Sequence, residues 1–136
     1  DVERSRGLGD VYKRQKMSRV ASTNKDFFNK FAKLVSNPEA YGGTVVNPGR
    51  SLTGIVVTED VPLWRVGTGY LNPEQKDSFS AALEDMLTRG AAVVGYSYET
   101  PIYIAQWVDE KLNWWEVDGR FSTTTSRHQT GYRLAV

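Results

Sequence analysis

The sequence predicts an α+β fold: a single small domain with an antiparallel sheet of about five strands, two main helices packed on one face and a short C-terminal helix. Three observations support this prediction. Two segments repeat apolar residues at helical spacing, several short β-rich runs are bounded by turn residues, and helices and hairpins follow one another along the chain. The chain has 136 residues, 40% of them hydrophobic, which suffices for one core.

The first helix is predicted over residues 22–35. Phe27, Phe31 and Val35 recur at a spacing of about four residues and form one apolar stripe. Asn37-Pro38 ends this helix, because proline disfavours a helical residue before it and has no amide hydrogen to donate.

A second helix is predicted to begin after Asn72. Asparagine is a favoured helix cap, Pro73 suits the first helical position, and Glu74 stabilises the positive end of the helix dipole. Phe79 lies on the apolar face of this helix. Gly90 is expected to end it, because glycine adopts the left-handed conformation readily.

Runs rich in β-branched and aromatic residues are predicted as strands. They cover residues 52–58, 62–71, 91–98, 101–108 and 113–117. A loop at residues 109–113 joins the last two runs as a hairpin, and Asp118-Gly119 marks a turn after them. The glycines within residues 65–69 indicate a bulge in the second run.

The last helix is predicted to start at Ser126, because Ser126 and Gln129 have the spacing of a capping box. In that motif the serine side chain accepts a hydrogen bond from the glutamine amide, and the glutamine side chain reaches back. Gly131 costs a helix about 1 kcal/mol relative to alanine, so we expect only one or two turns.

The composition excludes several kinds of site. The chain contains no cysteine, which excludes disulfides and thiolate chemistry and makes the cytoplasm the expected location. A single histidine leaves too few ligands for a typical metal site, and no phosphate-binding glycine loop occurs, so we expect neither a metal nor a cofactor. No apolar run reaches the roughly 18–20 residues of a membrane helix, so no membrane partner is expected.

Residues 1–16 have no helical or strand periodicity and precede Met17. The stretch RSRGLGDVYKRQ within them resembles a translated sequencing-adaptor read-through of the kind found at the ends of environmental sequence fragments. We therefore expect a non-native or disordered leader, followed by one domain over residues 17–136. Five Lys/Arg and three Asp/Glu give the leader a charge of +2, which leaves −1 of the total of +1 for the domain. A domain without net positive charge is a poor candidate for general nucleic-acid binding.

The closing segment FSTTTSRHQTGYR gathers polar side chains that suit an anion. A helix that starts within it would present free amides and a positive dipole end. The hydroxyls of Thr124, Thr125 and Ser126 add donors, and the planar guanidinium of Arg127 fits a phosphate or a carboxylate. His128 can donate to an oxyanion or serve as a hydrogen-bonded structural residue. The same segment also serves as a plain helix cap, and the sequence leaves both interpretations open.

Aromatic side chains are dense in the second half of the chain, and most of them are expected to build the core. Trp114 and Trp115 are adjacent on a strand, so they point to opposite faces and one of them should lie away from the core. With Tyr98, these rings suit stacking on the base of a nucleotide.

Two segments resemble a signature of an uncharacterised family of small phage and mobile-element proteins. They are SYETPI at residues 97–102, and FS at 121–122 followed by TTSRHQ at 124–129. The resemblance covers about the last 45 residues. The ending GYRLAV differs from the more basic terminal helix that is usual in the family. The resemblance implies a phage or mobile-element origin, and hence the host cytoplasm, but no established activity.

The sequence thus predicts a small non-enzymatic binding protein for a phosphate-bearing nucleotide, such as a signal in host antiviral defence. Alternatives are a binder of single-stranded nucleic acid, which the charge disfavours, and a protein-binding inhibitor of a host factor. A hydrolase or lyase that pairs His128 with Glu99 or Glu116 is a further alternative. The free edges of the predicted sheet also favour a homo-oligomer, with the number of subunits left open.

Overall fold

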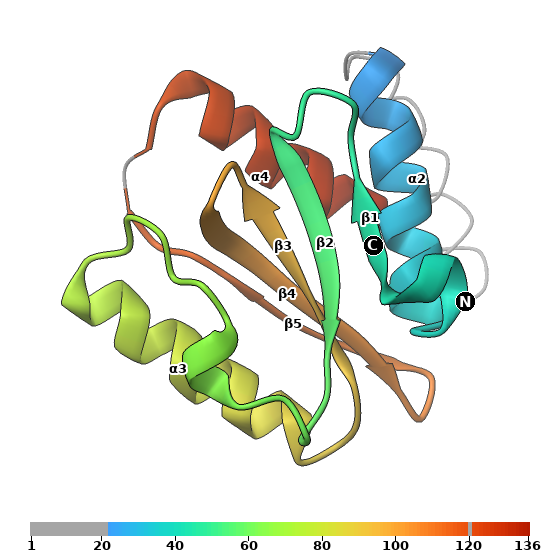
Figure 1. Ribbon diagram of the computed structural model, residues 1–136, viewed down its shortest axis with the longest axis vertical. Coiled ribbons are helices and arrows are strands. Elements are labelled where there is room, and N and C mark those ends of the chain that lie inside the picture. The colour runs from blue at the N-terminus through green and yellow to red at the C-terminus, as the bar shows by residue number, and fades with distance from the viewer. Residues whose placement is uncertain (1–21, 120) are drawn as a thin grey trace, which may run out of the picture.

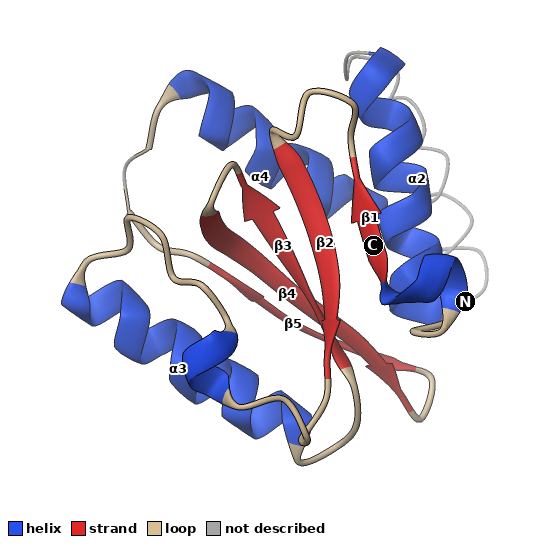
Figure 2. Ribbon diagram, in the orientation of Figure 1, coloured by secondary structure: helices blue, strands red, loops and turns tan. Residues whose placement is uncertain are grey.

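The computed structural model describes residues 22–119 and 121–136, which form one α+β domain (Figure 1). Its sheet has five antiparallel strands in the order β1-β2-β3-β4-β5, so each strand pairs with its neighbours in sequence. The strands are β1 (Thr44–Val46), β2 (Leu52–Val57), β3 (Ala92–Ser97), β4 (Thr100–Val108) and β5 (Lys111–Glu116). The α-helices are α2 (Ser22–Ser36), α3 (Pro73–Leu87) and α4 (Thr123–Ala135) (Figure 2). The predicted fold class is confirmed, and the leader predicted at residues 1–16 lies outside the described residues.

Helix α2 and the start of helix α3 agree with their predictions because their signals are local, whereas α3 ends at Leu87 with Thr88 as its cap, before the predicted Gly90. Helix α2 ends directly before Asn37-Pro38. Helix α3 begins with a capping box, in which Asn72 Oδ1 accepts from the Gln75 amide at 2.8 Å and Gln75 Oε1 accepts from the Asn72 amide at 3.0 Å. Pro73 holds the first helical position, where its missing amide hydrogen is not needed.

The helices cover both faces of the sheet, so the prediction that the two main helices share one face is wrong. Tyr103 and its strand partner Glu116 point to the face of α2 and α4, where Tyr103 stacks on Tyr132 of α4. Trp115 precedes Glu116 and therefore points to the other face. There its ring contacts Phe79 of α3. Figure 1 shows α3 on one side of the sheet, and α2 with α4 on the other.

The prediction of a strand over residues 62–71 is wrong, and so is the prediction of a bulge within it. This segment is a loop with a short 3-10 turn at Leu63–Arg65. Gly69 adopts a φ of +52°, and the Tyr70 amide donates to the side chain of Thr100 in β4 instead of to the backbone of a neighbouring strand. The sheet has a strand that was not predicted, β1, whose three residues pair with β2. Three residues are too few to give a recognisable alternating pattern.

The hairpin between β4 and β5 is tighter than predicted. Asp109 and Glu110 both have positive φ, at 51° and 63°, and form a two-residue turn. Lys111 and Leu112, which the sequence placed in the loop, therefore belong to β5 and pair with the end of β4.

Helix α4 starts earlier and runs longer than predicted, so the capping box at Ser126 is wrong. Its cap is Ser122, whose Oγ accepts from the Thr125 amide at 3.2 Å. The helix has 13 residues instead of one or two turns. Gly131 does not end it, because the missing side chain makes room for the ring of Phe28.

The core beneath α2 and α4 is a cluster of aromatic rings. Its members are Phe27, Phe28, Phe31, Tyr103 and Tyr132, with centroids 4.8–6.5 Å apart. Gly54 and Gly95 pair across β2 and β3 beneath these rings. A Cβ at Gly54 would lie 2.8 Å from Phe31, and one at Gly95 would lie 2.5 Å from Tyr132. The glycine pair therefore lets α2 and α4 approach the sheet closely.

Candidate functional site

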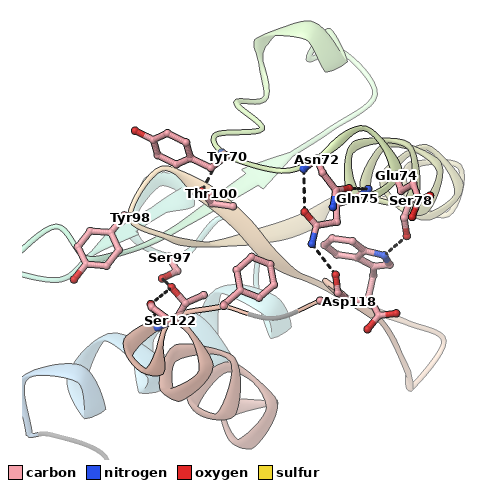
Figure 3. A pocket seen from close by; sticks show the side chains of 14 residues that line it. Tyr70, Asn72, Glu74, Gln75, Ser78, Ser97, Tyr98, Thr100, Asp118 and Ser122 are labelled. Atoms are coloured by element: carbon pink, nitrogen blue, oxygen red, sulfur yellow. Dashed lines mark hydrogen bonds between the residues drawn. The ribbon is translucent and has the colours of Figure 1, made fainter.

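A pocket of about 900 Å³ lies between the N-terminal ends of α3 and α4, next to the turn from β3 to β4 (Figure 3). Both helices begin on the same side of the molecule, as Figure 1 shows. The described lining consists of Tyr70, Asn72, Glu74, Gln75, Ser78, Ser97, Tyr98, Thr100, Trp115, Asp118, Gly119, Phe121, Ser122 and Thr125. The pocket thus joins segments that are far apart in the sequence.

Gln75 fixes the α3 side of the pocket. Besides its part in the capping box, its Nε2 donates to the carbonyl of Asp118 at 2.7 Å, which fastens the segment after β5 to the start of α3. Gly119 follows with a φ of +136°, and a Cβ there would lie 2.6 Å from the Gln75 Nε2. Trp115 forms part of the wall, and its indole Nε1 donates to Ser78 Oγ at 3.0 Å.

On the α4 side, polar side chains form a hydrogen-bonded chain that leads from the surface into the core. Ser122 Oγ donates to Thr125 Oγ1 at 3.2 Å. Thr125 Oγ1 lies 3.3 Å from Ser97 Oγ, which in turn lies 2.7 Å from His128 Nδ1. Ser97 belongs to β3 and the other residues belong to α4 or its cap, so this chain fastens the helix to the sheet.

His128 is buried and neutral at neutral pH. Burial penalises the charged imidazolium and holds the pKa of His128 below its ordinary value of 6.5. A neutral imidazole that accepts at Nδ1 carries its proton on Nε2. In this tautomer Ser97 donates to His128, Thr125 donates to Ser97 and each hydroxyl of the chain donates once, whereas in the other tautomer His128 Nδ1 donates to Ser97. The arrangement makes His128 the inner end of a structural link between α4 and β3.

The lowered pKa of His128 predicts a pH-dependent stability. The unfolded chain binds a proton near pH 6.5, whereas the folded chain binds it only at lower pH. The free energy of unfolding should therefore be constant just above pH 6.5 and fall as the pH drops from about 6.5 through the lowered folded pKa. Urea unfolding across this window measures the loss, which His128→Asn should abolish. As the chain has one histidine, an imidazole NMR titration checks the folded pKa directly, and a value at or above 6.5 would contradict the prediction.

Tyr98 stands at the mouth of the pocket in a strained conformation. It begins the turn from β3 to β4 with a φ of +55°, a region that residues other than glycine avoid. Its ring is 56% exposed and lies 6.0 Å from the ring of His128. Tyr70 is 87% exposed and supplies a second ring on the same side of the pocket (Figure 3). Strain of this kind is concentrated at functional sites.

Some of the residues predicted to bind a ligand lie at this pocket. They are Tyr98, Thr125 and Trp115. His128 lies behind them, with its Nδ1 bonded to Ser97. Glu116, one of the acid–base partners considered for His128, forms an ion pair with Arg133 at 2.8 Å.

The other predicted ligand residues lie outside the lining of the pocket. Three of them, Thr124, Ser126 and Arg127, are exposed on α4 and do not line the pocket. Trp114 points to the opposite face from Trp115, is 55% exposed and stacks on Tyr103 at 6.3 Å. The two tryptophans therefore lie on different faces, as the sequence predicts, and only Trp115 can contact a ligand in this pocket.

The two ends of the pocket differ in electrostatic character. Glu74 and Asp118 are the charged residues of the described lining, and both lie toward α3. The first turn of α4 carries no acidic side chain, so its dipole is not offset there. The pocket thus offers carboxylate acceptors at the α3 end, and hydroxyl groups with a positive dipole end at the α4 end.

Sequence reasoning missed Tyr70, the start of α3 and the segment after β5 as parts of a site. The Asn72-to-Gln75 segment and Asp118-Gly119 were recognisable only as a helix cap and a turn. The one available signal was that polar caps begin two helices, since helix N-termini are favoured ligand sites. No pattern in the sequence indicates that these two caps meet.

Comparison with protein-family models, with curated proteins and with solved structures finds no match to this chain. The resemblance to phage proteins therefore stays a prediction. Within residues 22–119 and 121–136, no group of three or more metal-ligating side chains comes together. Within the same residues, none of the helices combines the length and the apolar composition that a membrane-spanning segment needs.

Proposed function

We propose that this chain is a nucleotide-binding protein that takes the nucleoside part of its ligand into the pocket between α3 and α4. The observation that carries the proposal is the pocket itself. Its volume of about 900 Å³ falls within the roughly 300–1,000 Å³ of small-ligand sites. Its walls combine aromatic rings, which can stack on a base, with many polar groups from separate elements, which can bond the edge of a base and a sugar.

The α3 end of the pocket suits the edge of a nucleobase. Glu74 and Asp118 can accept hydrogen bonds, and the exocyclic amines of bases donate them, as when carboxylates recognise cytosine. The rings of Trp115 and Phe121 line the same pocket and offer surfaces on which a base can stack.

The α4 end and the mouth suit the rest of a nucleotide. Ser122 and Thr125 present hydroxyl groups that can bond a sugar, and Tyr70 and Tyr98 present rings at the mouth. A phosphate is repelled by the carboxylates of the α3 end, so it should remain near the mouth. The resemblance to phage proteins supports a host-defence nucleotide as the physiological ligand.

Tyr98→Gly tests the proposal by separating binding from stability. Loss of the ring that contacts the bound nucleoside at the mouth should weaken the binding of nucleosides about 10-fold, since a contact with an aromatic ring contributes roughly 0.5–1.5 kcal/mol. The free energy of unfolding should change by less than about 1 kcal/mol, because glycine relieves the strain at φ +55° while the ring contact is lost. Calorimetric titration with the four ribonucleosides and urea unfolding measure the two quantities.

Tyr41→Gly is the matched control for this experiment. Tyr41 is also a half-exposed tyrosine with a positive φ, at 53°, but it lies in the turn before β1 and not in the lining of the pocket. It should leave nucleoside affinity unchanged. If no nucleoside binds the parent protein, or if Tyr98→Gly binds as tightly as Tyr41→Gly, the proposed function is wrong.

A further inference from the structure

A second hollow of about 590 Å³ adjoins the pocket and has no place in the function proposed above. It is lined by Arg50, Thr53, Tyr70, Tyr98 and Glu99. Tyr70 and Tyr98 line both spaces, so the pocket and this hollow adjoin at these two residues. A ligand that leaves the pocket past these rings therefore enters the hollow.

Arg50 occupies a rigid turn between β1 and β2. Its φ is +56°, and its amide donates to the carbonyl of Asn47 at 3.0 Å. Asn47 is buried and holds the turn from within, since its Oδ1 accepts from the Leu52 amide at 3.0 Å and its Nδ2 donates to Ser51 at 2.9 Å. The backbone that carries the guanidinium is thus fixed before any ligand arrives.

The guanidinium of Arg50 is available to an anion. Its side chain is exposed, and no ion pair joins it to any residue that the structure describes. Glu99 lines the same hollow without pairing with it. A planar guanidinium binds phosphate through two parallel hydrogen bonds. The hollow sets this cation beside one carboxylate, whereas the described lining of the pocket has two carboxylates and no Lys or Arg.

We propose that the hollow is a phosphate subsite, in which Arg50 binds the phosphate of a nucleotide whose nucleoside part lies in the pocket. This inference rests on the proposed function. It places the phosphate beyond Tyr70 and Tyr98, and not at Arg127, which lines neither space. The ligand class is then a nucleoside phosphate that passes between the two tyrosines.

The test compares each ribonucleoside with its 5′-monophosphate by calorimetric titration at low salt. The parent should bind the monophosphate about 10-fold more tightly than the nucleoside, as expected for a charge-assisted hydrogen-bonded pair. Arg50→Gln should abolish this advantage and leave nucleoside affinity unchanged. Arg127→Gln should keep the advantage, and added salt should reduce it in the parent.

The outcomes separate this inference from the proposed function. If nucleosides bind and the monophosphate is no tighter, or its advantage survives in Arg50→Gln, the phosphate subsite is wrong while the pocket stands. If Arg127→Gln abolishes the advantage instead, the phosphate lies at α4. If neither nucleosides nor monophosphates bind the parent, both proposals are overturned.

Discussion

Replacing Gly69 with alanine is expected to lower the free energy of unfolding by about 3 kcal/mol, because two penalties combine at this position. Gly69 has a φ of +52°, where a Cβ is strained. That Cβ would also lie 2.5 Å from the carbonyl oxygen of Glu99 and 2.8 Å from the Cα of Thr100. Both are backbone atoms, so relief requires the loop or the turn from β3 to β4 to move.

The same movement should impair the pocket, since Tyr70 follows Gly69 directly and lines it. Gly67→Ala is the matched control in the same loop. Its Cβ would have no neighbour within 4 Å, and its φ is not positive, so stability and binding should both be unchanged. Urea unfolding of the two variants decides the matter. Equal free energies of unfolding for Gly69→Ala and Gly67→Ala would show that Gly69 is not packed against the turn from β3 to β4.

Tyr132→Ala is expected to destabilise the fold by about 4 kcal/mol, in the range for removal of a large buried aromatic side chain. The ring of Tyr132 is fully buried and contacts Phe27, Phe28 and Phe31 as well as Tyr103. Its hydroxyl donates to the carbonyl of Tyr96 at 2.6 Å, with the carbonyl of Thr53 at 3.1 Å. One side chain thus fastens α4 to β2 and β3.

Tyr132→Phe separates the contribution of the ring to stability from that of the hydroxyl. It keeps the ring and removes the hydroxyl, so the expected loss is about 1–2 kcal/mol. Tyr70→Ala is the control for deletion of a tyrosine ring, and it should change the free energy of unfolding by less than about 0.5 kcal/mol because Tyr70 is exposed. Chemical denaturation measures all three variants. A Tyr132→Ala loss as small as that of Tyr70→Ala would contradict the packing of α4.

The sequence predicts most reliably those elements whose signals are local. The stripe of phenylalanines in α2, and the Asn72-Pro73 start of α3, act within one or two turns of a helix, so no distant contact is needed to interpret them. The alternating run at residues 62–71 led to a wrong prediction of a strand, because Gly69 and Tyr70 are positioned by Thr100 of another strand. Alternation alone does not supply a pairing partner.

The error at α4 has a similar cause. Gly131 lowers helix propensity, but the glycine is required where Phe28 packs against the helix. Tertiary contact therefore outweighs a propensity difference of about 1 kcal/mol. The predicted capping box at Ser126 also fails because Ser122, four residues earlier, serves as the cap.

The sequence predicts the types of side chain at the candidate site, but only part of its location. Thr125, Tyr98 and Trp115 were identified because hydroxyl and aromatic groups near a helix start suit a ligand. The wall formed by α3 was not identified. It joins the pocket through the hydrogen bond from Gln75 to the carbonyl of Asp118, which links residues 43 apart. Contacts of that range depend on topology, which local patterns do not encode.

The contact between Tyr132 and β2 also bears on the order of folding. It joins residues 79 apart, whereas residues that pair between neighbouring strands are at most 45 apart, as between Leu52 and Ser97. Long loops cost entropy before their contacts form, so the meander of strands can assemble first and α4 can dock afterwards. Ser122 and Thr125 reach the pocket only with that docking. A ligand held there would bind the completed fold alone and act mainly on the rate of unfolding, which makes the pocket a marker of the last folding step.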